Sequence, residues 1–515
     1  MPMLVGDIVK RQARINAKKV GLIDGNKEFP YKKINERVNQ LANALLSLGL
    51  RKGNKVAFMA DNGHEFAEAY FATAKAGLII VPVNARSNPN EVTYTLNHSE
   101  SDVFIYEGEF DEVVEKARPS LNTIKNFIRI GEADGSVRSY EAVLSSMSPE
   151  EPKEGVDIDD VTMIMYTSGA TGEAKGVLIT QRNLMATANS MTLELRIVPE
   201  DINLLVMPMF HAGGLWPLLT HFYRGAKTII LPRFDEDQVL QIVEREKVTF
   251  LNLVPTTLRR LAIRPDLKDY NLESLRLIMY AGAPIPIHQL KEAMRIFGPH
   301  RFNTGLGATE ASCGGMLNLD IGEHALALDG PLASKLGSVG RDSMGIEVRI
   351  VDESDNEVPP CNVGEIVAKG DHIALGYWKM PEETSSTFKN GWLHTGDLGY
   401  RDEDGYVFIV GRKKDIIISG GENISSLEVE EAITQHPAVA EAAVIGVHDE
   451  LWGEAVKGIV VLKPGMKATE GEIISFCKER LAGYKSPKSV DFVSELPKNP
   501  AGKIKKGELK QRYTG

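Results

Sequence analysis

The sequence is poor in cysteine and in long apolar runs, and each shortage excludes a class of protein. Its three cysteines, Cys313, Cys361 and Cys477, show no CxxC spacing, so they give no metal-site signature and fit a reducing compartment. The longest apolar run, Leu78–Val83, is far too short to cross a bilayer, and no signal peptide is evident before Lys10. We therefore expect a cytoplasmic protein with no membrane span.

Basic charge is also in short supply. The 59 lysines and arginines stand against 70 acidic residues, and the resulting net charge of −11 argues against a nucleic acid as the default partner. Hydrophobic residues, in contrast, make up 43% of the 515 residues, enough to build a large core that should divide into domains. No internal repeat or low-complexity tract stands out. The sequence leaves the oligomeric state open, and a homo-oligomer is compatible with it.

One stretch, Tyr166–Val177, has the composition of a phosphate-binding loop. It follows an apolar run that predicts a buried strand. Its glycines let backbone N–H groups approach a polyphosphate, its hydroxyls donate hydrogen bonds, and its lysine adds a positive charge. The candidate ligands are Thr167, Ser168, Gly169, Thr171, Gly172 and Lys175. The spacing is not that of a Walker A motif, which disfavours a P-loop kinase or GTPase, and the remaining alternative is a surface loop without a ligand.

Around this loop, short apolar runs alternate with amphipathic segments. The predicted strands include Lys55–Met59, Val103–Tyr106, Leu204–Met207, Thr249–Val254 and Leu275–Tyr280, and the predicted helices include Ile34–Leu48, Glu65–Ala76, Asp235–Glu246 and Ile287–Phe297. This alternation predicts an α/β fold of parallel sheets covered by helices. Several strands end in unusual turns, at Pro208–Gly214, Pro255–Thr257, Ala281–Pro284 and Gly305–Glu310. Because ligands of such sheets bind beyond the carboxyl ends of strands, we expect one shared cleft.

The pattern changes near Ser338. Short strands in a Gly/Asp-rich context predict a small barrel-like sheet, and the end of the chain predicts a compact α+β unit, with a boundary near Gly411–Asp415. Close to the C-terminus, Pro and Gly turns present Lys503. The alternative for this stretch is a solvated basic tail.

Five motifs now stand in order: Tyr166–Val177, Gly307–Glu310, Gly391–Asp397, Gly411–Asp415 and Pro497–Ile504. In order and approximate spacing they resemble the adenylate-forming superfamily, which includes acyl-CoA synthetases, firefly-type luciferases and the adenylation domains of peptide synthetases. The resemblance covers essentially the whole chain. Within the superfamily, Ile416–Ile424 is similar to the form common in stand-alone acyl-CoA synthetases of the fatty or aromatic acid type.

The resemblance implies an ATP-dependent acid–thiol ligase. Such enzymes join a carboxylate to ATP, giving an acyl-adenylate and pyrophosphate, and then pass the acyl group to coenzyme A with release of AMP. Because one anion attacks another, the site must supply positive charge and aligned donors. Two alternatives stay open: an adenylating enzyme that hands the acyl group to a carrier protein, and a catalytically inactive nucleotide-binding protein.

The same resemblance assigns roles to individual residues. It implies that Glu310 holds Mg²⁺, that Thr309 donates to the α-phosphate, and that Asp397 accepts the ribose hydroxyls with support from Arg412. Lys503 is expected to reach the α-phosphate and the substrate carboxylate. One wall of the adenine slot is expected from Gly282, Ala283 and Pro284. The further residues expected to bind ATP or AMP are Gly305, Leu306, Gly307, Ala308 and Ile409.

Between the two half-reactions, members of this superfamily rotate a C-terminal lid domain. The resemblance implies a large domain over residues 1–410, a hinge over 411–415 with Lys414 at its pivot, and a mobile domain over 416–515. The rotation is expected to withdraw Lys503 and to bring the residues that bind coenzyme A to the thiol tunnel. These residues are Ser419, Gly420, Gly421 and Trp452, although the alternative for Trp452 is a place in the core.

Substrate choice is argued by analogy. The acyl pocket is expected to be lined by His211, Trp216, Val254, Leu306, Cys313 and Gly314. Acetyl-specific members carry a tryptophan where this chain has Gly307, so a medium-chain, branched, cyclic or aromatic acid is favoured over acetate. The alternative for His211 is a satisfied core histidine. Two departures from the superfamily are Leu306, where an aromatic residue usually stacks on adenine, and Gln181, where a histidine is common.

Overall fold

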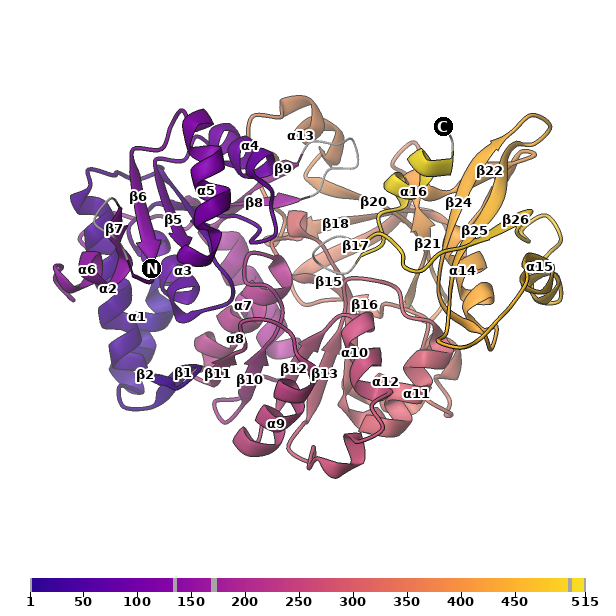
Figure 1. Cartoon of the computed structure of the whole chain (residues 1–515), viewed down its shortest axis with the longest axis horizontal. Coiled ribbons are helices and arrows are strands. Elements are labelled where there is room, and N and C mark those ends of the chain that lie inside the picture. The colour runs from indigo at the N-terminus through magenta and orange to yellow at the C-terminus, as the bar shows by residue number, and fades with distance from the viewer. Residues whose placement is uncertain (1, 133–136, 168–173, 499–502, 514–515) are drawn as a thin grey trace.

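The computed structural model describes residues 2–132, 137–167, 174–498 and 503–513. Within these residues the strands form four sheets. Figure 1 shows the first at the left, the second below the centre, the third above it and the fourth at the right. Among the described residues, no helix combines the length and the apolar character that crossing a bilayer requires.

The first sheet has the order β7-β6-β5-β3-β4-β8-β9 and is parallel except for the antiparallel pair β8–β9. Its strands are β3 (Lys55–Met59), β4 (Ile79–Pro82), β5 (Val103–Glu107), β6 (Asn126–Ile130), β7 (Arg138–Ser139), β8 (Val161–Thr167) and β9 (Lys175–Thr180). The helices near it are α2 (Tyr31–Ser47), α3 (His64–Lys75), α4 (Pro89–Ser99), α5 (Asp111–Ala117) and α6 (Tyr140–Ser145), with 3₁₀ turns η1 (Gly108–Phe110) and η2 (Arg118–Ser120).

The second sheet has the order β16-β15-β14-β13-β12-β10-β11-β1-β2, with a parallel centre and antiparallel edges. Its strands are β1 (Val20–Asp24), β2 (Lys27–Pro30), β10 (Ile202–Leu205), β11 (Lys227–Ile230), β12 (Phe250–Leu253), β13 (Leu277–Tyr280), β14 (Phe302–Gly307), β15 (Gly315–Leu319) and β16 (Arg341–Asp342). The associated helices are α1 (Val5–Ile15), α7 (Gln181–Glu194), α8 (Ala212–Arg224), α9 (Glu236–Glu246), α10 (Pro255–Ala262), α11 (Ile287–Phe297) and α12 (Ile321–Ala327), with η3 (Leu267–Asp269), η4 (Pro299–Arg301), η5 (Thr309–Ala311) and η6 (Ala333–Lys335).

Helices α3 and α8 join the two large sheets. Nearly every residue of α3 is buried, and the ring of Phe71 on α3 stacks on Phe222 of α8 with centroids 5.5 Å apart. Both rings belong to an apolar cluster that includes residues of both sheets. The N-terminal hairpin β1–β2 was not predicted; β1 pairs in parallel with β11, so the start of the chain completes the second sheet.

The predicted alternation of strands and helices is confirmed, and local signals set several boundaries. Helix α7 begins directly after Thr180, because the Thr180 hydroxyl accepts a hydrogen bond from the Asn183 backbone N–H at 3.2 Å. The Asn183 side chain in turn accepts one from the Thr180 N–H. In the same way Asn88 and Glu91 cap the first turn of α4.

The third sheet is small and antiparallel. It consists of β17 (Ile346–Val351), β18 (Gly364–Gly370), β19 (Phe388–Lys389), β20 (Trp392–Arg401) and β21 (Val407–Arg412), with α13 (Pro381–Thr387) inserted after β18. The turn η7 (Lys413–Asp415) leads from β21 to the C-terminal domain.

The C-terminal domain is an α+β unit with a core of its own. Its elements are β22 (Ile417–Ser419), β23 (Glu422–Ile424), α14 (Ser426–Thr434), β24 (Val439–Asp449), β25 (Gly453–Leu462), α15 (Glu470–Lys478), β26 (Ser489–Phe492) and α16 (Lys506–Tyr513). Arg259 donates to the Ala440 carbonyl at 2.7 Å and the Ile287 N–H donates to Glu431 at 3.3 Å, and these bonds connect the C-terminal domain to helices of the second sheet.

Candidate functional site

Charged residues from two sheets and from the C-terminal tail come close enough for their charges to act on one another. Glu310 lies in η5 after β14, Asp397 in β20, Arg412 at the end of β21, and Lys503 just before α16. The charges of Glu310, Arg412 and Lys503 all act on Asp397, and Lys503 also acts on His211. The structure therefore brings together residues that are widely separated in the sequence.

The Asp397–Arg412 pair is the best-defined contact of the cleft. Arg412 Nε lies 2.7 Å from Asp397 Oδ1, and the Asp397 side chain is buried whereas the guanidinium is half exposed. Burial raises the pKa of Asp397 above its ordinary value, against the opposing charges of Arg412 and Lys503. The arrangement holds one carboxylate in a partly dry position where it can accept hydroxyl hydrogen bonds.

Lys503 retains solvent-accessible surface, yet many protein atoms lie close to its ammonium. Burial, followed by the charge of Arg412, lowers the pKa of its ammonium, while Asp397 and Glu310 oppose this shift. An anionic ligand in the cleft would stabilise the charged form of this lysine.

The two ends of the glycine-rich loop are tied together. Thr167 ends β8 and Lys175 begins β9, and the two residues pair in the antiparallel ladder. The Lys175 ammonium lies 5.0 Å from the centre of the Tyr377 ring. The predicted ligands Ser168, Gly169, Thr171 and Gly172 lie outside the described residues.

The carboxylate of Glu310 fits a magnesium ion. Its Oε1 accepts a hydrogen bond from the Tyr377 hydroxyl at 2.8 Å. A carboxylate oxygen in a cleft is the hard ligand that Mg²⁺ prefers, and the ion usually keeps several waters. When bound, the ion neutralises charge on the phosphates. Thr309 is buried beside Glu310 in the same short turn.

His211 is a neutral imidazole at the start of α8. Its Nδ1 accepts a hydrogen bond from the Gly213 backbone N–H at 3.1 Å, which leaves Nε2 as the protonated nitrogen. Burial, with a further contribution from the charge of Lys503, lowers its pKa to about 4. His211 can therefore donate a hydrogen bond near the charged cleft at neutral pH, and this favours a site residue over a core histidine.

A buried asparagine, Asn62, positions the loop that carries His211. Its amide donates to the carbonyls of Met207 and Leu231, both at 3.1 Å, and accepts from the Met209 N–H at 2.7 Å. Sequence reasoning missed Asn62 and Tyr377, because neither has a local pattern that points to partners so distant along the chain.

Several of the residues expected to bind the nucleotide also lie close together. Leu306, Ala308 and Ile409 pack against one apolar cluster under the third sheet. Gly282 adopts a positive φ of 92°, and a Cβ there would approach Val254 Cγ1 to 3.7 Å, which places Val254 next to the Gly282–Pro284 turn. The strand β14 carries Gly305 and Gly307 at its end.

The predicted acyl-pocket residues come from several elements. Trp216 is buried on α8 with its ring edge toward Phe250 at 5.8 Å. The Cys313 thiol is buried 3.8 Å from Met165 Sδ, and burial raises its pKa to about 12, so it is an unreactive wall group. A Cβ on Gly307 would lie 2.7 Å from the Gly314 carbonyl oxygen, so the backbones of these two glycines lie in close contact.

The four residues expected to bind coenzyme A lie together on the C-terminal domain. Ser419 ends β22, and Gly420 and Gly421 form the following turn with φ of 61° and 86°. The Gly420 N–H donates to the Trp452 carbonyl at 2.8 Å, and the Trp452 ring covers Gly420 so closely that a Cβ would lie 2.7 Å from Cε3. Trp452 is 50% exposed, so its indole is a surface group rather than a core residue.

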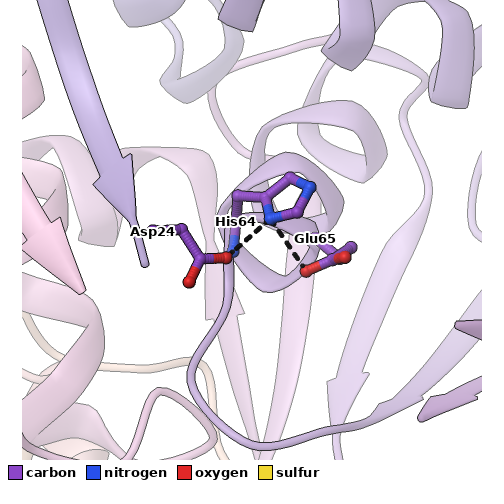
Figure 2. Close-up of side chains that lie close together, drawn as sticks. All are labelled: Asp24, His64 and Glu65. Atoms are coloured by element: carbon purple, nitrogen blue, oxygen red, sulfur yellow. Dashed lines mark hydrogen bonds and ion pairs between the residues drawn. The ribbon is translucent and has the colours of Figure 1, made fainter. Parts of the chain in front are cut away.

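A second group of potential metal ligands lies at the junction of the two large sheets. Figure 2 shows His64 between the carboxylates of Asp24 and Glu65, with Nδ1 at 2.7 Å and 3.1 Å from them, and the three ligand atoms lie within 4.8 Å of one another. Burial lowers the pKa of His64, but Asp24, Glu65 and Glu68 together raise it above its ordinary value. The group is therefore a hydrogen-bonded cluster in which the two carboxylates favour the charged form of the imidazole between them.

Comparison with known proteins connects this cleft to a family. A family model described as "AMP-binding enzyme" matches residues 9–378, and one described as "AMP-binding enzyme C-terminal domain" matches residues 428–503. The chain belongs to the AMP-binding enzyme family. The superfamily, the enzyme class and the α/β fold predicted from the sequence are thereby confirmed: the protein is an adenylate-forming acid–thiol ligase, a class that uses ATP, Mg²⁺ and coenzyme A.

Three relatives match along almost their whole length. The feruloyl-CoA synthase of Amycolatopsis sp is 36% identical over 504 residues, which is 98% of both chains. The anthranilate CoA ligase AuaEII in complex with anthranoyl-AMP is 28% identical, with a TM-score of 0.91 over 100% of this chain and 98% of that one. MatB from Rhodopseudomonas palustris matches with TM-scores of 0.89 when ATP is bound (29% identity) and 0.78 in its apo structure (29% identity), each over 99% of both chains.

Proposed function

We propose that this AMP-binding enzyme activates an aromatic carboxylic acid, or one of similar bulk, and transfers it to coenzyme A. The observation that carries this proposal is the backbone contact between Gly307 and Gly314, which leaves no side chain there to shorten the pocket. Full-length similarity to a feruloyl-CoA synthase and to an anthranilate CoA ligase supports an aromatic substrate.

In the adenylation step, Lys503 and the neutral His211 are proposed to orient the substrate carboxylate toward the α-phosphate. One carboxylate oxygen attacks the α-phosphorus, the bond to the β-phosphate oxygen breaks, and pyrophosphate leaves. Positive charge from Lys503 offsets the repulsion between the two anions. Thr309 is proposed to donate to the α-phosphate, and Asp397 with Arg412 to hold the ribose.

Glu310 is proposed to hold the magnesium ion, and Thr167 and Lys175 to face the leaving phosphates together with the loop between them. Adenine is proposed to lie between the Gly282–Pro284 turn and the aliphatic surface of Leu306 and Ile409. This assignment is supported by the packing of Leu306 and Ile409 against one apolar cluster and by the contact of the Lys175 ammonium with Tyr377, which binds Glu310.

For the second half-reaction, we propose rotation of the C-terminal domain about residues 411–415. Lys414 is exposed and η7 contains no buried residue, so no buried side chain of this turn opposes the rotation. The TM-score is higher to ATP-bound MatB than to apo MatB. This difference supports the interpretation that the two domains of this chain have the arrangement that binds the nucleotide. Rotation would remove Lys503 and bring Ser419–Gly421 and the exposed Trp452 to coenzyme A.

A panel of carboxylic acids scored by pyrophosphate release, with and without coenzyme A, tests this function. We expect the fastest turnover with cinnamic- or benzoic-type acids and little with acetate. Equal activity with acetate would overturn the proposed pocket. Comparing coenzyme A with a holo-carrier protein as acceptor separates the ligase from the carrier-loading alternative, and an absence of acid-dependent pyrophosphate–ATP exchange would show an inactive nucleotide-binding protein.

We also propose a cytoplasmic location. Cys313 and Cys477 are buried free thiols and Cys361 is an exposed one, which is the state expected in a reducing compartment.

A further inference from the structure

Tyr377 contacts two residues of the candidate site at once. It follows β18, its side chain is buried, and its hydroxyl donates to Glu310 Oε1 at 2.8 Å. The ammonium of Lys175 lies 5.0 Å from the centre of the same ring. One aromatic side chain therefore touches both the carboxylate assigned to Mg²⁺ and the lysine assigned to the phosphates.

The backbone around Tyr377 is tied to the segments that carry both partners. The Trp378 N–H donates to the Gly176 carbonyl at 2.7 Å, next to Lys175 at the start of β9. The Ala374 N–H donates to the Glu310 carbonyl at 2.9 Å. Because these bonds fix the strand-like segment against both neighbours, the ring is placed independently of any ligand.

The chemistry of the phenol suits a permanent donor. A phenol has a pKa of about 10, so the Tyr377 hydroxyl is a donor at neutral pH and a carboxylate is its natural acceptor. Its proton occupies Oε1 of Glu310 and fixes the carboxylate plane, and the second carboxylate oxygen remains to ligate a cation. The ring face attracts the Lys175 ammonium through its quadrupole.

We propose that Tyr377 is a positioning residue for the adenylation step. Its phenol orients the Glu310 carboxylate to accept Mg²⁺, and its ring holds Lys175 toward the phosphates. This inference rests on the proposed roles of Glu310 and Lys175. The competing interpretation is that Tyr377 only fills the core beside Phe388, whose ring centroid lies 5.6 Å away.

Equilibrium binding of ATP to the full-length protein, without any carboxylic acid, separates these interpretations. Affinity is measured by calorimetry with Mg²⁺ and with EDTA, and the ratio of the two dissociation constants gives the gain due to the metal. We expect Tyr377→Phe, which keeps the ring, to reduce that gain about tenfold, because a hydrogen bond to a charged group is lost. Its affinity for metal-free ATP should match the wild type.

Tyr377→Leu removes the ring as well. It should reduce the metal gain and also weaken metal-free ATP binding by about threefold, since the cation–π contact with Lys175 disappears. Tyr140→Phe is the matched control: Tyr140 Oη donates to Glu68 Oε2 at 2.8 Å, and both residues are buried outside the cleft. This control should change the thermal midpoint but neither affinity.

The outcomes distinguish the inference from the function on which it rests. If Glu310→Gln removes the metal gain but Tyr377→Phe leaves it intact, Tyr377 is only a packing residue and the proposal is wrong. If Glu310→Gln also leaves the gain intact, the metal role of Glu310 itself fails. Thermal unfolding of every variant ensures that only folded protein is compared.

Discussion

Two contact regions, or joints, differ in kind: the one between the two large sheets and the one between these sheets and the C-terminal domain. Between the two large sheets, the buried amide of Asn62 makes three hydrogen bonds, the His64 cluster links β1 to α3, and Phe71 stacks on Phe222. Between the large sheets and the C-terminal domain, hydrogen bonds come from Arg259 and Ile287 at the surface. We infer that the first contact region acts as a rigid body, whereas the second can open at low cost, as the proposed rotation of the C-terminal domain requires.

The largest expected effect concerns Lys503, the cation proposed to move with the C-terminal domain. Lys503→Ala should reduce adenylation by about a thousandfold, because a cation ~4 Å from a developing charge is worth roughly 4 kcal/mol at an effective dielectric near 20. Pyrophosphate–ATP exchange measures this step. Thioester formation from preformed acyl-adenylate should be unchanged, as should both steps in the exposed neighbour Lys505→Ala. An equal loss in both half-reactions would contradict the proposed role.

The next effect tests whether the loose joint must turn. Lys414→Pro fixes φ near −65°, a value compatible with the 3₁₀ turn observed at residues 413–415 but restrictive for rotation. We expect adenylation to be retained and thioester formation to fall about a hundredfold, a barrier increase of roughly 3 kcal/mol. Lys414→Ala, which removes the side chain but leaves the backbone free to rotate, is the control. Normal thioester formation in the proline variant would place the pivot elsewhere.

The sequence predicted the general plan of both joints but not their contacts. The ordered motifs implied that Glu310, Asp397 and Lys503 meet, and their charges do act on one another. The alternation of apolar runs and amphipathic segments predicted most strands and helices. Those inferences rest on superfamily spacing and on hydrophobic patterning. Neither signal reveals Asn62, because its partners Met207 and Leu231 lie far along the chain and the bond depends on how two sheets dock.

The partners of the β1–β2 hairpin and of Tyr377 could not be predicted from the sequence either. The hairpin β1–β2 has no partner until β11 has formed, so its sequence alone does not reveal which sheet it joins. The acceptor of the Tyr377 hydroxyl likewise depends on docking of the segment after β18 against β9. Tertiary context, rather than propensity, decides each of these contacts.

Breaking the rigid joint should affect stability more than chemistry. Asn62→Ala leaves the Met209 N–H and two carbonyls without the amide, and we expect a loss of about 2 kcal/mol in the free energy of unfolding. Because Met209 precedes His211 by two residues, KM for the acid should also rise. Denaturant unfolding and steady-state kinetics measure the two effects. Asn90→Ala, at an exposed position, is the control. An unchanged denaturation midpoint would show that Asn62 does not hold the sheets together.

The smallest effect is a pH dependence of the same joint. The folded pKa of His64 is raised, so its interaction with Asp24 and Glu65 stabilises the fold fully below about pH 6.5 and is lost as pH rises through the raised value. The pKa of Asp24 is lowered despite burial. Its contribution to the stability of the fold is therefore lost only in acid, as pH falls through the lowered value. Thermal midpoints between pH 6 and 9 should therefore decrease more in the wild type than in His64→Gln. His448→Gln, at an exposed position, should follow the wild type, and parallel curves for His64→Gln and wild type would mean that the imidazole carries no charge in the folded protein.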